Sequence, residues 1–152
     1  MVCVATRSLP LVMPNTDRFA RLLLAAWAGG LWTVCALVVP ALFHLIANKT
    51  QAGNVAAPLF YLQSVLGVVF GVLYGYLRWH RLDLWSRRCV MIAVLAPLVF
   101  LAALRPWMNA LRASGEMARF AQLHGVAGML FLIACVALGV LVWRAESTHP
   151  VA

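Results

Sequence analysis

The sequence contains few acidic residues, with four Asp and Glu against twelve Lys and Arg, so the formal net charge is +8. Only 11 % of its 152 residues are charged, whereas a soluble domain has about 25 %. This scarcity of charge excludes an ordinary soluble enzyme and a disordered chain. No paired carboxylates stand within the apolar runs, which argues against a proton-driven transporter.

The sequence also lacks the motifs of common catalytic sites. It has no Walker loop for phosphate, no His-Glu-x-x-His metal motif and no serine nucleophile elbow. Its cysteines, Cys3, Cys35, Cys89 and Cys135, form no Cys-x-x-Cys pair, which argues against a disulfide framework or a zinc knuckle. We interpret them as small apolar helix residues and predict that the protein is not an enzyme.

Long apolar runs dominate what is present. Hydrophobic residues make up 64 % of the chain, and the mean hydropathy is +0.92. Four runs, at about 22–46, 54–77, 89–104 and 120–143, approach or exceed the roughly 20 residues that cross a bilayer as a helix. The short segments between them make neighbouring helices antiparallel. The sequence therefore predicts an all-α, integral membrane, antiparallel four-helix bundle.

Basic residues are distributed unevenly around the predicted spans. The tails 1–21 and 144–152 and the loop 78–88 hold eight Lys and Arg, against four in the other connections. The positive-inside rule then places both termini in the cytoplasm, in the inner (plasma) membrane, where these cations meet anionic lipid head groups. We expect the first run to be an uncleaved anchor, with Met13 as an alternative start to Met1, and we expect no nucleic-acid binding.

Small residues recur at helical spacing in the predicted spans. Such patterns let helix backbones approach closely in lipid and favour tight packing or self-association. Pro40 is expected to kink the first span. The residues expected at helix contacts are Gly67, Gly71, Gly75, Ala25, Gly29, Gly30 and Gly128.

The segments that connect the predicted spans also lead to structural predictions. Residues 47–53 are predicted to form a short polar turn, and Asp83 to pair with a neighbouring arginine. The outer segment 105–119 has Pro106 where a short helix would begin, and this helix could lie along the membrane surface.

Polar residues of the predicted spans gather toward the outer face, and His124 stands out among them. Histidine is a common metal and haem ligand, so His124 and His44 could together hold haem iron or copper. Arg105 could then contact a propionate or another anion. The alternative is that the histidines are interfacial or packing residues and that Arg105 extends to the head groups.

The order of several short motifs resembles the transmembrane protein 205-like family, a four-helix membrane domain of unknown function. The motifs are WAGGLW leading into VVPALF, then AG at 52–53, PLF at 58–60, LRP at 104–106 and FAQLHG at 120–125. A more distant resemblance is to copper-resistance-D and protoporphyrinogen-oxidase-J proteins. His44 is not carried over by the resemblance. The positions that are carried over are Gly30, Pro40, Phe43, Ala52, Gly53, Phe60, Arg105, Pro106, Phe120 and His124.

Three functions stay open from the sequence. The first is a non-enzymatic membrane or assembly protein of unknown role, which predicts no cofactor. The second is a haem- or transition-metal-binding membrane protein with its site near the outer face. The third is a small transporter or efflux component, which predicts a homo-oligomer because four helices enclose little aqueous space.

Overall fold

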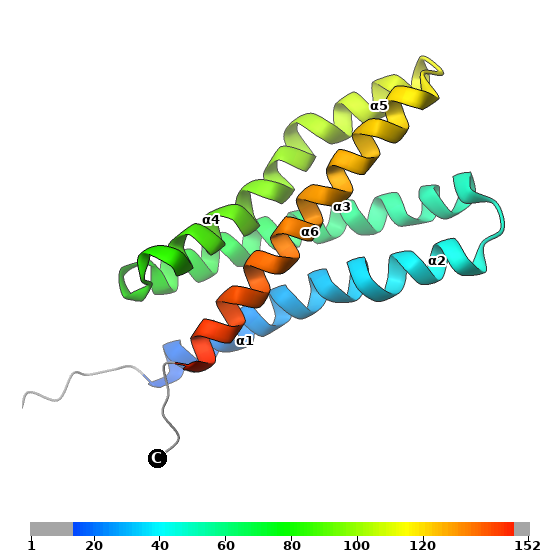
Figure 1. Ribbon diagram of the computed structural model, residues 1–152. Coiled ribbons are helices and arrows are strands. Elements are labelled where there is room, and N and C mark those ends of the chain that lie inside the picture. The colour runs from blue at the N-terminus through cyan, green and yellow to red at the C-terminus, as the bar shows by residue number, and fades with distance from the viewer. Residues whose placement is uncertain (1–13, 148–152) are drawn as a thin grey trace, which may run out of the picture.

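The computed structural model describes residues 14–147, and the side chains of residues 15–145. Arg7 of the basic tail and the alternative start at Met13 lie outside this range. Every secondary-structure element within it is helical (Figure 1). In chain order the elements are α1 (Pro14–Trp32), η1 (Thr33–Val38), α2 (Val39–Leu45), α3 (Lys49–Arg78), η2 (Trp79–Arg81), α4 (Leu84–Val99), η3 (Phe100–Leu104), α5 (Arg105–Ala113) and α6 (Met117–Ser147).

These elements join into four long helical rods, Asn15–Leu45, Lys49–Arg81, Leu84–Ala113 and Met117–Ala145. Each rod is apolar and has at least 29 residues, more than the roughly 20 that span the hydrocarbon core. The predicted all-α four-helix membrane fold is thus confirmed. The first rod begins before residue 22, because α1 already starts at Pro14.

Two π-helical segments precede two of the prolines in the rods, whereas Pro58 and Pro97 lie inside the α-helices α3 and α4. One, η1, ends just before Pro40, and the other, η3, ends just before Pro106. Proline lacks the N–H of a regular turn, and its ring crowds the carbonyl four residues earlier, which a wider π turn relieves. The predicted short helix at Pro106 exists as α5. Because η3 keeps the chain helical from α4, however, α5 prolongs that rod instead of breaking away along the surface.

The turn between α2 and α3 is shorter than the predicted turn at 47–53. Asn48 caps α3, since its Oδ1 accepts hydrogen bonds from the backbone N–H groups of Thr50 (2.9 Å) and Gln51 (3.2 Å). The helix therefore begins at Lys49. The turn between α5 and α6 contains Gly115 at φ 77°, a left-handed conformation that glycine adopts without strain.

Trp27 of α1 forms the centre of the packing between α1, α3 and α4. It is 1 % exposed and lies against the α3 face that bears Gly67 and Gly71. A Cβ on Gly67 would sit 3.4 Å from Trp27 Nε1, and one on Gly71 would overlap Val94 of α4. Close approach at this face therefore depends on the absence of side chains.

The contact expected at Ala25 and Gly29 is absent within the described chain. Both residues are exposed, and a Cβ on Gly29 would meet nothing within 4 Å. The reason is that α1 turns its opposite face, with Leu24 and Trp27, toward the bundle. Self-association through the Ala25 face stays a prediction.

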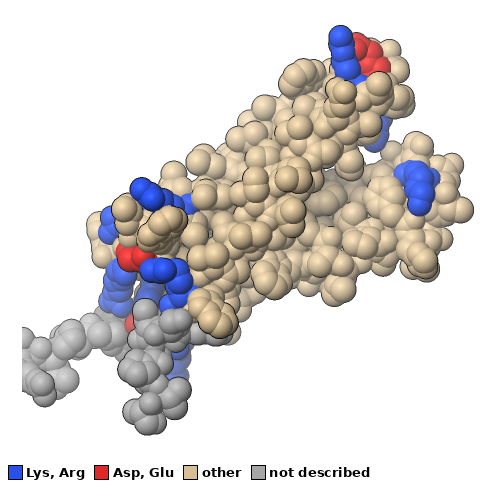
Figure 2. All heavy atoms as spheres, in the orientation of Figure 1, with Lys and Arg blue, Asp and Glu red and all other residues tan. Residues whose placement is uncertain are grey.

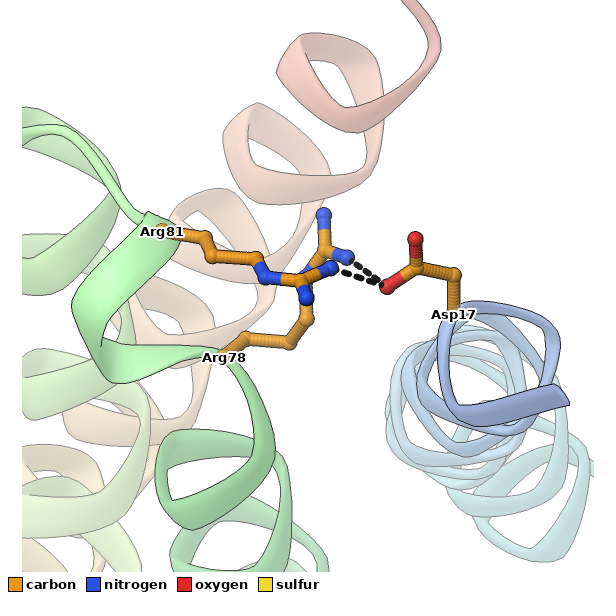
Figure 3. A network of polar contacts seen from close by, with 3 residues as sticks. All are labelled: Asp17, Arg78 and Arg81. Carbon is orange, nitrogen blue, oxygen red and sulfur yellow. Dashed lines mark hydrogen bonds and ion pairs between the residues drawn. The ribbon is translucent and has the colours of Figure 1, made fainter. Parts of the chain in front are cut away.

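Ion pairs connect the rods at the end where α1 begins and α6 ends, which we call the terminal end. The Asp17 carboxylate of α1 accepts hydrogen bonds from the guanidinium groups of Arg78 and of Arg81 (2.9 Å), at the end of α3 and in η2 (Figure 3). The Asp17 side chain is 19 % exposed, so this contact is partly shielded from water. It ties the first rod to the second.

The expected pairing of Asp83 with a neighbouring arginine is wrong. Asp83 caps α4 by accepting from the Ser86 hydroxyl, and it pairs with Arg144 near the end of α6 (2.8 Å). Its neighbours have other partners, since Arg81 binds Asp17 and Arg87 donates to the Trp79 carbonyl. The hydrogen bond from Ser86 and the charge of Arg144 lower the pKa of Asp83. The α3–α4 turn is thereby joined to the fourth rod.

Candidate functional site

A cavity of about 730 Å³ lies at the far end of the bundle, opposite the terminal end. Here the arm formed by α2 and the start of α3 diverges from the arm formed by α5 and the start of α6 (Figure 1). Figure 2 shows the hollow between the arms, with charged side chains gathered at the two ends of the molecule and apolar surface between them. The volume falls within the roughly 300–1,000 Å³ of small-molecule sites.

Small residues on the facing helices create this space. Gly53 of α3 and Gly125 and Gly128 of α6 line it, and a Cβ on any of the three would meet nothing within 4 Å. Ala56 and Ala57 continue the small-residue wall on α3. Gly128 was expected to pack against another helix, but it leaves room for the cavity instead.

Five phenyl rings form part of the apolar lining. Phe131 of α6 is 4 % exposed and contacts Phe60 of α3 at 5.0 Å and Phe100 of η3 at 5.1 Å between ring centroids. Phe43 and Phe120 add two rings on the opposite arms. The three-ring contact closes the cavity toward the centre of the bundle.

Two cations line the same cavity. Lys49 of α3 donates through Nζ to the Phe43 carbonyl (3.0 Å), and Arg112 of α5 donates to Asn54 Oδ1 (3.1 Å). The Arg112 guanidinium also lies over the Phe120 ring, 4.7 Å from its centroid. Within the described chain, neither cation forms a salt bridge with a carboxylate. The nearby acid, Glu116, pairs with Arg119 (2.7 Å), so the cavity carries an uncompensated positive charge.

Of the three residues predicted to share a site, His124 lines the cavity, whereas His44 and Arg105 do not. His124 stacks on Phe120 with the ring planes 15° apart. His44 is exposed on the last turn of α2, and Arg105 lies over the Tyr61 ring, 4.3 Å from its centroid. In the described range there is no group of three His, Cys, Asp or Glu residues that could hold a metal ion.

Lys49 and Arg112 were not singled out by sequence reasoning. Their only sequence signal was an excess of cations over acids in the outer connections, which does not say which cation faces inward. The positions carried over from the family resemblance indicated the cavity residues better. Those that line the cavity are Phe43, Gly53, Phe60, Phe120 and His124.

A second unpredicted contact joins the first rod to the last. The Trp32 indole N–H of α1 donates to the Cys135 carbonyl of α6 (3.1 Å). Because the partners come from the first and last rods, no spacing in the sequence could reveal this contact.

The fold and the cavity together define a multi-pass, four-helix membrane protein. The chain belongs to the family described as Domain of unknown function (DUF4149), whose model matches residues 22–117. The match runs from within α1 to the first residue of α6 and includes both cations of the cavity. No curated protein and no solved structure matches the chain. The resemblances to the transmembrane protein 205-like family and to copper-resistance-D and protoporphyrinogen-oxidase-J proteins stay predictions from the sequence.

Proposed function

We propose that this protein binds an anionic amphiphile in the cavity, with the acidic head group at Lys49 and Arg112 and the hydrocarbon chain among the phenyl rings. The observation that carries the proposal is the pair of cations without carboxylate partners on a largely apolar cavity wall. The protein acts as a non-enzymatic binding or carrier protein of the inner membrane.

The chemistry of the two cations supports an acidic head group. Arg112 uses one N–H group on Asn54, and the rest of the guanidinium stays available for the paired hydrogen bonds that carboxylates and phosphates accept. Lys49 adds a second charge from the opposite arm. An uncharged lipid would leave both cations uncompensated beside an apolar wall, which is unfavourable.

The orientation of the bundle follows from its charges and forms part of the proposal. The terminal end carries the arginines of the basic tail and loop, including Arg78, Arg81 and Arg144, and the far end carries fewer cations. With both termini in the cytoplasm, the cavity opens toward the outer leaflet. An amphiphile of that leaflet then enters sideways between the two arms.

Neutralising the cavity cations is expected to weaken binding of an acidic amphiphile. For a fluorescent long-chain fatty acid, Arg112→Gln or Lys49→Gln should each raise Kd about tenfold, because each removes a charge-assisted contact of about 1.4 kcal/mol. Binding is measured by fluorescence titration of the purified protein in lipid nanodiscs. The primary amide of the same fatty acid should bind weakly to all variants.

The matched control is Arg119→Gln. Arg119 stands at the same end of the molecule, but it pairs with Glu116 and does not line the cavity. Its replacement should leave Kd unchanged. Equal binding of the acid and the amide, or an equal loss in Arg119→Gln, would contradict the proposal.

Haem is a second candidate for the same cavity, because His124 could supply an axial nitrogen while Lys49 and Arg112 receive the propionates. If haem binds, the protein should show a Soret band, either as purified or after addition of haemin. The His124→Ala substitution should remove this band. His44→Ala is the control, because His44 lies outside the cavity lining. The Soret band should persist in this variant. A protein that stays colourless with haemin would exclude this candidate, and metal analysis of the same sample tests for copper.

A further inference from the structure

A second and much smaller cavity lies at the centre of the bundle, where α1, α3, α4 and α6 meet. Its volume is about 10 Å³, close to the smallest space that holds one water molecule. The size of the cavity therefore limits its ligand to a single molecule as small as water. All four rods contribute to the wall, α1 with Trp27, α3 with Gln63, α4 with Ala93 and Pro97, and α6 with Phe131.

Two side chains of this wall present polar atoms to the cavity. Gln63 is 8 % exposed and Trp27 is 1 % exposed, and neither the amide nor the indole N–H has a hydrogen-bond partner among the described residues. In the same part of the chain, every fully enclosed side-chain N or O atom does have a partner. The polar atoms of Gln63 and Trp27 are therefore not fully enclosed, and the surface they retain borders the cavity that both residues line.

Two glycines show how these polar groups are spaced. A Cβ on Gly30 of α1 would stand 3.3 Å from Gln63 Oε1, and a Cβ on Gly67 of α3 would stand 3.4 Å from Trp27 Nε1. Gln63 therefore packs on α1 one turn beyond Trp27, and the indole packs on α3 one turn beyond Gln63. One helical turn is about 5.4 Å, which is too long for a direct hydrogen bond but suits a single bridging water.

Pro97 adds a backbone acceptor to the same wall. Proline has no N–H, so the Ala93 carbonyl, one turn earlier in α4, lacks its regular α-helical donor. Ala93 is 1 % exposed, and both residues line the cavity. A backbone carbonyl without a donor is costly within the hydrocarbon region of a membrane. A water molecule in the cavity would supply that donor.

We infer that this small cavity is a binding site for one water molecule, which bridges α1, α3 and α4 at the centre of the bundle. The water accepts a hydrogen bond from the Trp27 indole N–H and donates to the Gln63 amide oxygen and to the Ala93 carbonyl. Three hydrogen bonds are typical of a buried water in a protein. Phe131 lines both cavities and so stands between this site and the larger one. The water site is therefore independent of what the larger cavity binds.

The test follows magnetisation transfer from water to the tryptophan indole protons by NMR. The full-length chain, labelled with ¹⁵N in its tryptophans, is placed in lipid nanodiscs without added ligand. A bound water gives cross-peaks of opposite sign in the NOE and ROE experiments, whereas proton exchange with bulk water gives the same sign in both. We expect opposite signs for the Trp27 indole. The Trp32 indole is the control and should give no water cross-peak, because its N–H donates to the Cys135 carbonyl.

Two neighbouring residues of α3 provide matched variants. Gln63→Leu removes a polar partner of the water at similar side-chain volume and should abolish the Trp27 cross-peak. Ser64→Ala should preserve it, because Ser64 is equally buried and polar but donates to the Phe60 carbonyl (2.6 Å) and does not line the cavity.

The unmodified protein decides the inference even if Gln63→Leu does not fold. No water cross-peak at Trp27, or one with the same sign in both experiments, would overturn the inference. A cross-peak that survives in folded Gln63→Leu, or that is lost equally in Ser64→Ala, would also overturn it.

Discussion

Replacing Gly71 with alanine is expected to lower the free energy of unfolding by about 2 kcal/mol, within the range of overpacked cores. The added Cβ would overlap Val94 of α4 and stand 2.7 and 2.9 Å from two ring carbons of Trp27. Trp27 is 1 % exposed at the centre of the bundle, so moving its ring would displace the side chains packed around it. The helices α1, α3 and α4 must then separate.

The same substitution one turn later is the control. A Cβ on Gly75 would lie 3.9 Å from Val90, an ordinary van der Waals distance. Gly75→Ala should therefore be neutral or stabilise the protein by up to about 0.5–1 kcal/mol, because alanine favours the helix over glycine. Unfolding in graded detergent mixtures, followed by circular dichroism, measures both. Equal stabilities for the two variants would refute the packing assigned to Gly71.

Filling the cavity is expected to abolish binding without unfolding the protein. Gly128→Phe places a ring in the cavity, where a Cβ meets nothing within 4 Å, so the helix can accept it without a clash at its base. The ring would occupy space that the hydrocarbon chain needs. We expect Kd for the fluorescent fatty acid to rise at least about 100-fold, equivalent to roughly 2.7 kcal/mol.

Gly29→Phe is a close control for this variant. Gly29 is also an exposed helical glycine at which a Cβ would meet nothing within 4 Å, but it does not line the cavity. The binding and the unfolding of Gly29→Phe should match those of the unmodified protein. If Gly128→Phe binds as tightly as Gly29→Phe, the amphiphile does not occupy the cavity.

Much of the fold could be predicted from the sequence because lipid imposes a simple requirement. A chain in hydrocarbon must satisfy its own backbone hydrogen bonds, so each long apolar run becomes a helix. Apart from residue 46, the predicted spans fall within the four rods, and the short connections make them antiparallel. The ends were less predictable: Asn48 and Asp83 cap helices, and the π segments before Pro40 and Pro106 keep the rods continuous.

The site was only partly predictable, for a geometric reason. Position along a helix follows from residue number, so the sequence correctly indicated that His124 and Arg112 lie near the same end. Which way a side chain faces depends on how the helix is rotated against its neighbours. That rotation brings His124 into the cavity wall and leaves His44 exposed, although both were expected to share a site.

The sequence by itself determined the class of protein, the number of its spans and the depth of its polar residues, because these depend on hydrophobicity and helical rise alone. Only the tertiary structure decided that Trp27 packs on Gly71, that Lys49 and Arg112 face one cavity, and that Trp32 donates to the Cys135 carbonyl. These contacts join residues from different rods. They depend on the rotation and crossing of whole helices, which are set by the packing of all four together.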